Sequence, residues 1–327
     1  MKYRVAREGK ADFRSLGEAL QALSTLPENP GRTTVSIGEG IYREKLRVTL
    51  PRLSLVGEGA ERTVLSWDDH ATRLLPSGER MNTFNSYTLY VGADDFFAQG
   101  LTIENSAGDG RKKGQAIACY VDADGAIFSE CAINGHQDTL FIGPLPDNPA
   151  PKGINLVHPV RIAGCEGPRG PQCSNFRNCY IEGDVDFIFG SGMAIFEGCT
   201  IISLDRGEKV NGYITAPSTL LGQELGFVFL DCNLESEAGT GTVFLGRPWR
   251  RSAKAAFIRC KMQAHIALQG WDNWENPENE KTVEFLEWNN SGPGSALGNR
   301  PAWIRTEPLP PGLLESFQLT RAPEPNE

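Results

Sequence analysis

The sequence predicts an all-β fold, a parallel β-helix in which one short unit recurs along the chain. A phenylalanine is followed three positions later by cysteine and, after two more, by an apolar residue. This pattern occurs five times, as Phe128-x-x-Cys131-x-Ile133, Phe176-x-x-Cys179-x-Ile181, Phe196-x-x-Cys199-x-Ile201, Phe229-x-x-Cys232-x-Leu234 and Phe257-x-x-Cys260-x-Met262. Two-residue alternation is the strand period, and long segments with the 3.6-residue helical period are scarce. Such units bury their inner faces only by stacking, which predicts one extended core.

The elements follow in chain order. Residues 12–23 predict a short amphipathic helix that caps the open end of the first coil, with Asp12 or Ser15 as the N-cap. Its apolar face holds Leu16, Ala19, Leu20 and Leu23. β-branched and aromatic residues between Gly, Asn and Asp turns predict the early strands. These strands are expected at 33–37, 53–56, 88–91 and 115–121.

The whole chain, 1–327, is predicted to be one domain, because no linker divides it and repeat folds often run to this length. Successive cysteines of the repeat are 48, 20, 33 and 28 residues apart, so the longest interval predicts an inserted loop at about 143–172. Such a loop is expected near the rim of a cleft. The Pro-rich tail from Pro308 is predicted to be a surface strap that ends in a polar stub at about 319–327.

Charge and hydropathy limit the partners. The net charge is −9 with no long basic run, which argues against nucleic-acid binding. No stretch approaches 18 consecutive apolar residues, so no membrane partner is expected, and a monomer is predicted. The first 22 residues lack the apolar core and cleavage site of a signal peptide. We therefore expect a cytoplasmic protein, with secretion as the alternative if the sequence has been trimmed.

The chain has eight cysteines, and most of them fall in the repeat. Free cysteine behaves as a small buried hydrophobe, so the repeated cysteines are predicted to pack in the core. Ligands one coil apart point along a ladder and do not converge on a tetrahedron, so no metal is expected. Cys165 and Cys173 are assigned to the Gly/Pro-rich region outside the repeat and are expected to be unpaired surface thiols, with a disulfide between them as the alternative.

Two carboxylates are out of place in this apolar repeat. Asp138 and Asp186 each lie in a segment rich in strand-forming residues, where an ionised carboxylate is costly to desolvate unless a cation pairs with it. Arg247 is the obvious partner. If Arg247 lies beside Asp186, it keeps that carboxylate charged while Asp138 retains its proton more readily. The pattern predicts a carboxylate-based active site laid across several coils.

Several blocks together carry a family resemblance. They are Gly40-x-Tyr42-x-Glu44, Leu-Thr-Ile-Glu-Asn-Ser-Ala-Gly at 101–108, Gln-Ala-Ile-Ala at 115–118, Gly-His-Gln-Asp-Thr-Leu at 135–140, Gly-Asp-Val-Asp-Phe-Ile-Phe-Gly at 183–190 and Leu-Gly-Arg-Pro-Trp at 245–249. In sequence and in order they resemble the signature blocks of pectin methylesterases, over about residues 12–274. The resemblance implies a single-stranded right-handed parallel β-helix and an esterase that removes methyl groups from the galacturonate of pectin or of methylated oligogalacturonides, with no cofactor and no metal.

The resemblance also implies roles for the catalytic residues. Asp186 matches the family's nucleophile, which forms an acyl-enzyme and releases methanol. Asp138 matches the general acid that protonates the leaving methoxide and then activates water. Gln115 and Gln137 match amide donors that stabilise the oxyanion, beside Arg247.

Four further residues are predicted to bind substrate. Trp249 matches an aromatic residue that stacks on a sugar ring, and Phe189 and Thr83 match substrate-contacting positions. Trp271, with Trp274, either extends the sugar cleft or closes the last coils. His136 stands where the family often has Tyr or Phe, so one wall of the cleft is expected to be polar.

Two other functions stay open. Paired carboxylates on a β-helix also suit a glycosidase acting on polygalacturonate, although Arg247 and two amides suit an oxyanion better than an oxocarbenium ion. A noncatalytic pectin-binding solenoid is the second alternative. It is disfavoured because Asp138, Asp186 and Arg247 are all present together with both glutamines. A thioesterase is a weaker variant of the esterase reading.

Overall fold

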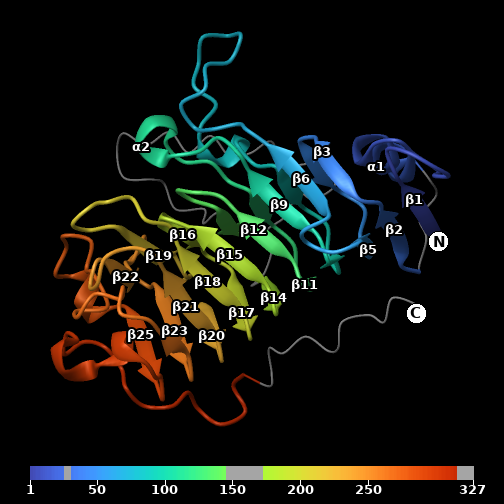
Figure 1. Cartoon of the computed structure of the whole chain (residues 1–327). Helices are drawn as coiled ribbons and strands as arrows, with labels where there is room; N and C mark the ends of the chain where they lie inside the picture. The colour runs from blue at the N-terminus through green and yellow to red at the C-terminus, as the bar shows by residue number, and fades with distance from the viewer. Residues whose placement is uncertain (26–30, 145–171, 315–327) are drawn as a thin grey trace.

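The computed structural model describes residues 1–25, 31–144 and 172–314. In these ranges the strands form three parallel sheets that run along the molecule, with the N-terminal coil at one end and β25 at the other (Figure 1). Sheet A contains β1 (Lys2–Val5), β2 (Thr33–Ile37), β5 (Leu53–Gly57), β8 (Phe97–Gln99), β11 (Ala126–Ser129), β14 (Cys173–Arg177), β17 (Met193–Glu197), β20 (Phe227–Leu230), β23 (Lys254–Ile258) and β25 (Glu284–Trp288).

The other two sheets complete each coil. Sheet B contains β3 (Gly40–Arg43), β6 (Thr63–Trp67), β9 (Thr102–Asn105), β12 (Ala132–Asn134), β15 (Tyr180–Gly183), β18 (Thr200–Ser203), β21 (Asn233–Ser236) and β24 (Lys261–Met262). Sheet C contains β4 (Leu46–Val48), β7 (Leu89–Val91), β10 (Cys119–Val121), β13 (Leu140–Ile142), β16 (Val185–Gly190), β19 (Gly212–Pro217) and β22 (Val243–Gly246). Successive strands pair in parallel, so the predicted parallel β-helix is confirmed.

The helices within the described ranges are few and short. They are α1 (Leu16–Ser24), α2 (Gly110–Lys113) and the 3₁₀ turns η1 (Thr83–Asn85), η2 (Asn279–Lys281), η3 (Pro293–Ser295) and η4 (Leu297–Asn299). Ser15 caps α1, and Glu18 completes a capping box, so the first of the two predicted N-caps, Asp12, is wrong. The apolar face of α1 packs against β4 at the N-terminal end, which confirms the predicted cap. Among the described residues, no helix is long and apolar enough to cross a membrane.

The alternation predicted that each repeat forms one strand. In the structure each repeat instead spans a corner between two strands. Phe128 lies on β11 and Ile133 on β12, and between them Glu130 adopts a φ of 52° that turns the chain from sheet A to sheet B. The other four repeats turn in the same way, at Asn178, Gly198, Asp231 and Arg259. Two-residue alternation cannot distinguish a straight strand from two strands joined at a corner. One left-handed residue turns the chain, yet the apolar side chains before and after it still point into the core.

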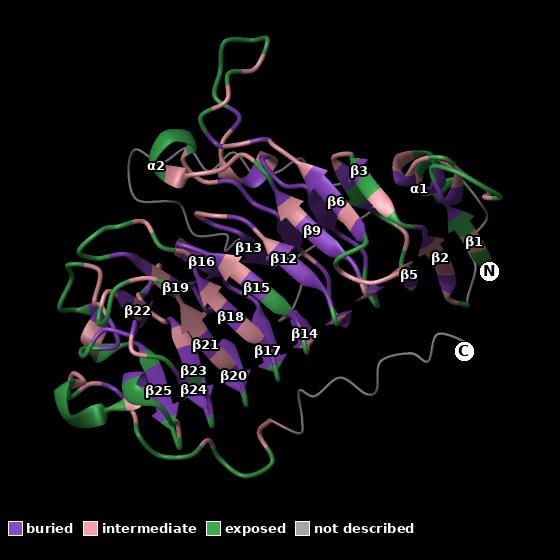
Figure 2. Ribbon diagram, in the orientation of Figure 1, coloured by how far each residue is buried: buried purple, intermediate pink, exposed green. Residues whose placement is uncertain are grey.

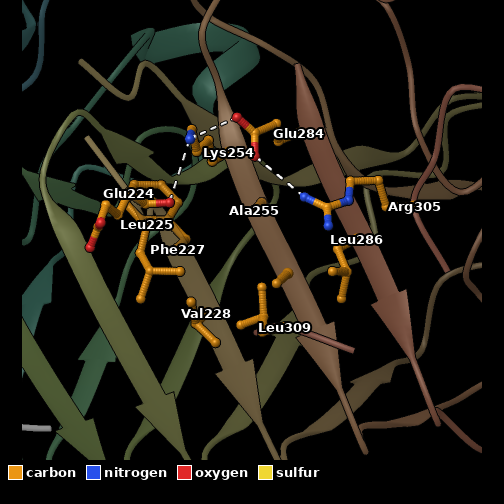
Figure 3. A pocket seen from close by; sticks show the side chains of 12 residues that line it. Glu224, Leu225, Phe227, Val228, Lys254, Ala255, Glu284, Leu286, Arg305 and Leu309 are labelled. Atoms are coloured by element: carbon orange, nitrogen blue, oxygen red, sulfur yellow. Dashed lines mark hydrogen bonds and ion pairs between the residues drawn. The ribbon is translucent and has the colours of Figure 1, made fainter. Parts of the chain in front are cut away.

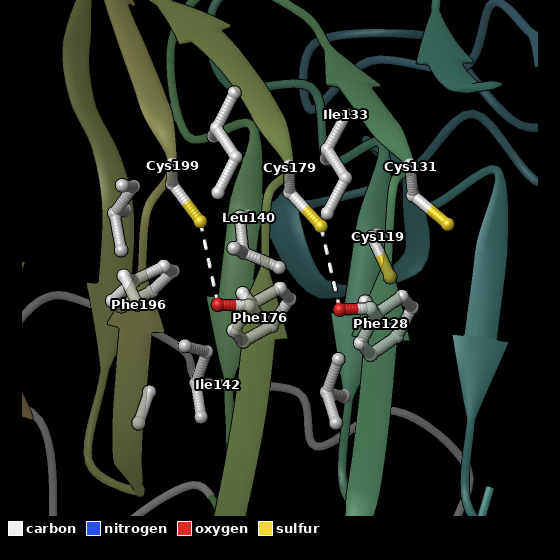
Figure 4. Close-up of a cluster of buried hydrophobic side chains, with 14 of the residues drawn as sticks. Cys119, Phe128, Cys131, Ile133, Leu140, Ile142, Phe176, Cys179, Phe196 and Cys199 are labelled. Atoms are coloured by element: carbon white, nitrogen blue, oxygen red, sulfur yellow. Dashed lines mark hydrogen bonds between the residues drawn. The ribbon is translucent and has the colours of Figure 1, made fainter. Parts of the chain in front are cut away.

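The corner stacks identical side chains from coil to coil. Phe128, Phe176 and Phe196 are stacked at centroid distances of 4.9 and 4.8 Å, and the stack continues to Phe229 and Phe257. From the second repeat on, each cysteine thiol donates to the carbonyl of a phenylalanine in the preceding coil, as from Cys179 to Phe128 at 3.4 Å (Figure 4). The repeated cysteines are buried, and the loss of hydration raises the thiol pKa values of Cys131 and Cys179. Their predicted packing role is confirmed.

Two predictions need correction, and two others fall outside the described residues. Cys173 is not a surface thiol, because it begins β14 and is 5% exposed against the apolar outer face of sheet A. The strand predicted at 115–121 is shorter, because Gln115 and Ala116 bond to the flanking coils at Ala71 and Gln137 outside the regular ladder. The inserted loop falls mostly on 145–171, Cys165 included, and the polar stub on 315–327, so neither is described.

The described C-terminal strap crosses the outer face of sheet A. Glu284 on β25 bridges Lys254 at 2.7 Å and Arg305 at 3.4 Å, and Leu309 packs beside this ion-pair network (Figure 3). Leu313 and Leu314 pack on the same apolar face. The predicted surface strap is therefore present up to residue 314, and buried positions run through all three sheets above it (Figure 2).

The last coils are closed by a buried ion pair. Arg300 donates to both oxygens of Glu287, at 2.6 and 3.0 Å, and these side chains are only 3% and 1% exposed. Arg300 also donates to the carbonyls of Ala267, Leu268 and Gly294. The pair therefore ties the chain after β25 to the loop that follows β24.

We expect Glu287→Gln to lower the free energy of unfolding by about 3–5 kcal/mol, because it leaves Arg300 charged and buried without its carboxylate. Urea unfolding followed by circular dichroism measures this. Glu278→Gln is the matched control, since Glu278 pairs with Lys281 at 2.6 Å on an exposed surface, and we expect less than about 1 kcal/mol. Equal effects of the two variants would contradict a structural role for the buried pair.

Candidate active site

The two candidate carboxylates lie one coil apart despite the 48 residues between them. β11, β12 and β13 pair directly with β14, β15 and β16, so the inserted segment adds no coil. Asp138 precedes β13, Asp186 lies on β16, and the backbone N–H of Asp138 donates to the carbonyl of Val185 at 3.1 Å. Parallel stacking therefore brings the two aspartates to one face of sheet C.

Both aspartates have left-handed backbones, with φ of 63° at Asp138 and 51° at Asp186. Such values are uncommon outside glycine and tend to mark functional sites. The register between β16 and β19 also shifts between Val185 and Ile188, so the ladder is irregular where Asp186 leaves it. This local backbone aims a carboxylate out of an otherwise apolar strand.

A pocket of about 350 Å³ opens on this face. It is lined by Asp138, Asp186, Arg247, Gln115, Gln137, Trp249, Phe189 and Thr83, together with Ala71, Asn82, Phe84, Ala216, Arg250 and Trp274. The structure thus brings together eight of the nine predicted site residues. Within the described part of the chain, no group of three or more His, Cys, Asp or Glu side chains is placed to hold a metal ion.

Arg247 forms a two-pronged ion pair with Asp186. Its Nε and Nη2 donate to the two carboxylate oxygens at 2.8 and 2.7 Å. The guanidinium also lies between two aromatic rings, at 3.9 Å from the ring centroids of Tyr213 and Trp274. Packed between two rings and bonded to both oxygens, the arginine is held in one orientation.

The environment separates the protonation of the two aspartates. Loss of hydration and the neighbouring Asp186 carboxylate raise the pKa of Asp138 well above its ordinary value, and Arg247 only partly opposes this. Burial also raises the pKa of Asp186, but the hydrogen bonds and charge of Arg247 act directly against that rise. Asp186 is therefore the first of the pair to ionise, and Asp138 keeps a proton.

This order predicts a bell-shaped dependence of kcat/KM on pH. The rate falls at low pH as Asp186 gains a proton and at high pH as Asp138 loses one, and both limbs lie above the range of ordinary carboxyl groups because both pKa values are raised. Initial rates from about pH 3 to about pH 10 test it. An acid limb alone, with no fall on the alkaline side, would contradict the assignment of Asp138 as the acid.

Trp271 is not part of this pocket, and its predicted contact with substrate is wrong. It is 2% exposed, stacks on Phe285 with centroids 4.3 Å apart and donates from Nε1 to Glu287 at 2.9 Å. A β-bridge joins it to Gly246, where a larger side chain would collide with Thr215. Of the two uses considered for this tryptophan, it closes the last coils, and it supports the strand end from which Arg247 emerges.

The apolar wall of the pocket is an aromatic cluster on the outer face of sheet C. Trp249 stacks with Phe84 at 6.5 Å and lies 5.9 Å from Phe189. Phe141 and Tyr120 are buried members of the same cluster. The predicted Trp249 and Phe189 are thus side by side, and the partly buried Trp249 offers a ring beside the carboxylates.

The buried side chain of Asn105 links three segments that lie behind the pocket. Its buried Nδ2 contacts the carbonyls of Asp69 and Ser86 at 2.9 Å and that of Ile117 at 3.0 Å. Asp69 and Ser86 bracket the loop that carries Thr83 and Phe84, and Ile117 follows Gln115. This gives a structural reason for the asparagine in the 101–108 block, to which the sequence assigned no role.

His136 lies outside the pocket lining. Its Nδ1 is 3.3 Å from a carboxylate oxygen of the buried Asp184, and this contact raises the pKa of His136. The polar side chain expected at this position therefore pairs with a third carboxylate behind the site and forms no part of the pocket wall.

Sequence reasoning missed Tyr213 and Arg250 and left Trp274 undecided. Tyr213 pairs in register with Val185, one coil from Asp186, a relation that only the stacking of β16 on β19 reveals. Arg250 directly follows the Leu-Gly-Arg-Pro-Trp block, so its position was the available signal. Trp274 lines the pocket and packs on Arg247, whereas Trp271 three residues earlier is buried.

The chain is similar to known proteins along most of its length. A family model described as Pectinesterase matches residues 2–144 and 172–310. Pectinesterase 31 of Arabidopsis thaliana is 34% identical over 313 residues, which cover 92% of this chain and 86% of that protein.

Two solved structures share the fold over 94% of this chain. One is a pectin methylesterase variant in complex with a hexasaccharide, 27% identical with a TM-score of 0.76 and 92% of its chain covered. The other is the pectin methylesterase from carrot, 26% identical with a TM-score of 0.74 and 88% covered.

Proposed function

This chain belongs to the pectinesterase family and is a carboxylic ester hydrolase, and from that premise we propose how its site residues divide the reaction. The substrate is pectin, whose galacturonate methyl esters it hydrolyses to free carboxylates and methanol. The observation that carries the assignment of roles is the two-pronged contact of Arg247 with Asp186, whereas the described residues give Asp138 no such partner.

In the first half of the reaction, ionised Asp186 attacks the ester carbonyl carbon through one carboxylate oxygen. The carbonyl oxygen gains the negative charge, and Gln115 and Gln137, which line the same pocket, supply amide N–H groups for it. The bond to the methoxy oxygen then breaks as the proton of Asp138 moves to that oxygen. Methanol leaves, and an acyl-enzyme anhydride on Asp186 remains.

In the second half, water attacks the acyl carbon while Asp138, now ionised, takes one of its protons. The bond to Asp186 breaks and restores its carboxylate, while Asp138 is again protonated. The galacturonic acid product leaves and loses the other proton of the water molecule to solvent. Arg247 holds Asp186 oriented and charged between turnovers. The aromatic face of Trp249 offers a platform for the apolar face of a sugar ring, and Thr83 borders the same pocket.

Methanol release from methylated pectin tests the function, with short methylated oligogalacturonides assayed beside it. We propose that the oligomers are turned over as well as the polymer. Formation of new reducing ends without methanol would indicate the glycosidase alternative, and binding without either product would indicate a noncatalytic solenoid. Hydrolysis of an acyl-CoA substrate alone would indicate a thioesterase.

Two further expectations stay predictions. A monomer is expected, and light scattering on the purified protein measures it. A cytoplasmic location is expected, and fractionation of cells followed by the methanol assay on each fraction measures that.

A further inference from the structure

A histidine–aspartate pair joins the two coils of the active site from outside the pocket. His136 lies two residues before Asp138, and Asp184 lies two residues before Asp186. The ring Nδ1 of His136 is 3.3 Å from a carboxylate oxygen of Asp184, and the backbone N–H of Asp184 donates to the carbonyl of His136 at 3.0 Å. Neither residue lines the pocket, so neither is placed to touch the reacting ester. The pair therefore stands in the same position along the chain relative to both catalytic aspartates.

Burial makes the charge of Asp184 significant. Its side chain is 1% exposed, one carboxylate oxygen accepts the backbone N–H of Val185 at 2.6 Å, and the other contacts His136. Because an ionised carboxylate only accepts hydrogen bonds, Nδ1 of His136 carries a proton and Nε2 is the nitrogen that titrates. The histidine side chain is 34% exposed, so its second proton exchanges with solvent while the carboxylate stays buried.

The charges around His136 favour its protonated form. The hydrogen bond to Asp184 raises the pKa of His136 above its ordinary value, and loss of hydration partly opposes that rise. The charges of Asp184, of Asp109 at the start of α2 and of Glu182 on β15 add to it. Asp109 is also paired with Arg111, at 2.9 Å. His136 is therefore still protonated at a pH where an isolated histidine has begun to lose its charge.

The charge of Asp184 reaches both catalytic aspartates. Burial is the largest cause of the raised pKa of Asp138, and the negative charge of Asp184 adds to it. Burial is also the largest cause at Asp186, where Asp184 again raises the pKa and Arg247 lowers it. A protonated His136 beside Asp184 cancels this contribution, because the pair then has no net charge. The effect of Asp184 on the two aspartates therefore depends on whether His136 holds its second proton.

We propose that the His136–Asp184 pair widens the pH range in which the enzyme is active. The reaction needs an ionised Asp186 and a protonated Asp138. On the acid side His136 is protonated, the charge of Asp184 is cancelled, and Asp186 ionises more readily. On the alkaline side His136 is neutral, the uncancelled charge of Asp184 acts on Asp138, and the general acid keeps its proton longer. This rests on the proposed function, and both members of the pair are positioning residues that act through the aspartates.

The test records kcat/KM for methanol release from methylated pectin against pH, in the full chain. His136→Gln removes the charge that titrates, Asp184→Asn removes the charge that it cancels, and a third variant carries both changes. Asp231→Asn is the control, because Asp231 pairs with Arg259 at 2.7 Å on an exposed surface. Each rate is divided by the rate of the same variant at its optimum, so that the fraction of folded enzyme cancels. Circular dichroism at each pH checks that the fold persists.

The two single variants are expected to narrow the profile from opposite sides. His136→Gln should lower the relative rate on the acid flank about threefold to tenfold and leave the alkaline flank unchanged, because the histidine is already neutral there. Asp184→Asn should lower it by a similar factor on the alkaline flank and not on the acid flank. The variant with both changes should regain the acid flank, since no charge is left to cancel, and Asp231→Asn should move neither flank.

A structural role alone would lower the rates without moving the flanks. Unmoved flanks in either single variant, or narrowing on the same side in both, would therefore overturn the proposal. NMR shifts of the ring nitrogens in the unmodified enzyme add a test that needs no variant. His136 must titrate between the two midpoints of the rate profile, and titration outside that interval would also overturn the proposal. Absence of methanol release by the unmodified enzyme at every pH would instead reject the proposed function.

Discussion

Replacing Asp186 by alanine is expected to reduce methanol release by about 10⁴-fold or more, because the variant has no nucleophile to form the acyl-enzyme. The fold is expected to survive, since the side chain faces the pocket and the core beneath it comes from Phe187 and Ile188. Arg247 loses its carboxylate but keeps the rings of Tyr213 and Trp274 on either side. Initial rates of methanol release, together with a urea unfolding curve, measure both effects.

The chain offers a matched control for this variant. Asp231 also has a left-handed backbone and also accepts two bonds from one arginine, Arg259, at 2.8 and 2.7 Å, but both side chains are about half exposed. Asp231→Ala is expected to leave the rate unchanged and to alter stability by less than about 1 kcal/mol. Near-normal turnover in Asp186→Ala would contradict the assignment of Asp186 as the nucleophile. Water would then have to attack the ester carbonyl of the substrate directly.

The fold was largely predictable because the same physical requirement recurs in every coil. The positions that face inward must be apolar, and the Phe-x-x-Cys pattern records that requirement five times. The corner was not predictable, since one left-handed residue such as Glu130 leaves the inward pattern intact while it changes sheets. Cys173 was misplaced for a related reason, because it packs on the outer face of sheet A, where no repeat marks it.

The candidate catalytic residues could be identified in the sequence because charged side chains are unusual in such apolar segments. Asp138 and Asp186 are carboxylates in apolar strand segments, and only a functional partner such as Arg247 justifies them. Aromatic residues are common both in cores and in pockets, so the sequence alone does not show which of the two a tryptophan occupies. Trp271 and Trp274 are three residues apart, yet Trp271 is in the core and Trp274, with a left-handed φ of 56°, lines the pocket.

Tyr213 and Arg250 illustrate a further limit of sequence reasoning. The position of Tyr213 depends on which residue of β19 stacks on β16, and the irregular register there is set by the bulge at Asp186. Arg250 lines the pocket because the folded chain places its guanidinium 4.7 Å from the centroid of the Trp249 ring. Neither fact can be derived from composition or spacing.

Replacing Arg247 by lysine keeps the positive charge and is nevertheless expected to lower kcat about 10²-fold to 10³-fold. The guanidinium bonds to both oxygens of Asp186 and fills the space between the rings of Tyr213 and Trp274, each 3.9 Å away. A lysine ammonium is a point charge that cannot make two parallel bonds and stack on two rings together. Asp186 would then rotate, and its pKa would rise further as the opposing hydrogen bonds are lost.

The pH dependence separates this positioning role from a merely structural one. In Arg247→Lys the acid limb of kcat/KM should move to higher pH, because a larger share of Asp186 is protonated at any given pH, while the alkaline limb set by Asp138 should move less. Arg259→Lys, which alters the same two-pronged geometry on the exposed surface, should change neither limb. Full activity with an unmoved acid limb in Arg247→Lys would reduce Arg247 to a structural residue, and the separation of the two aspartates would then have to come from burial alone.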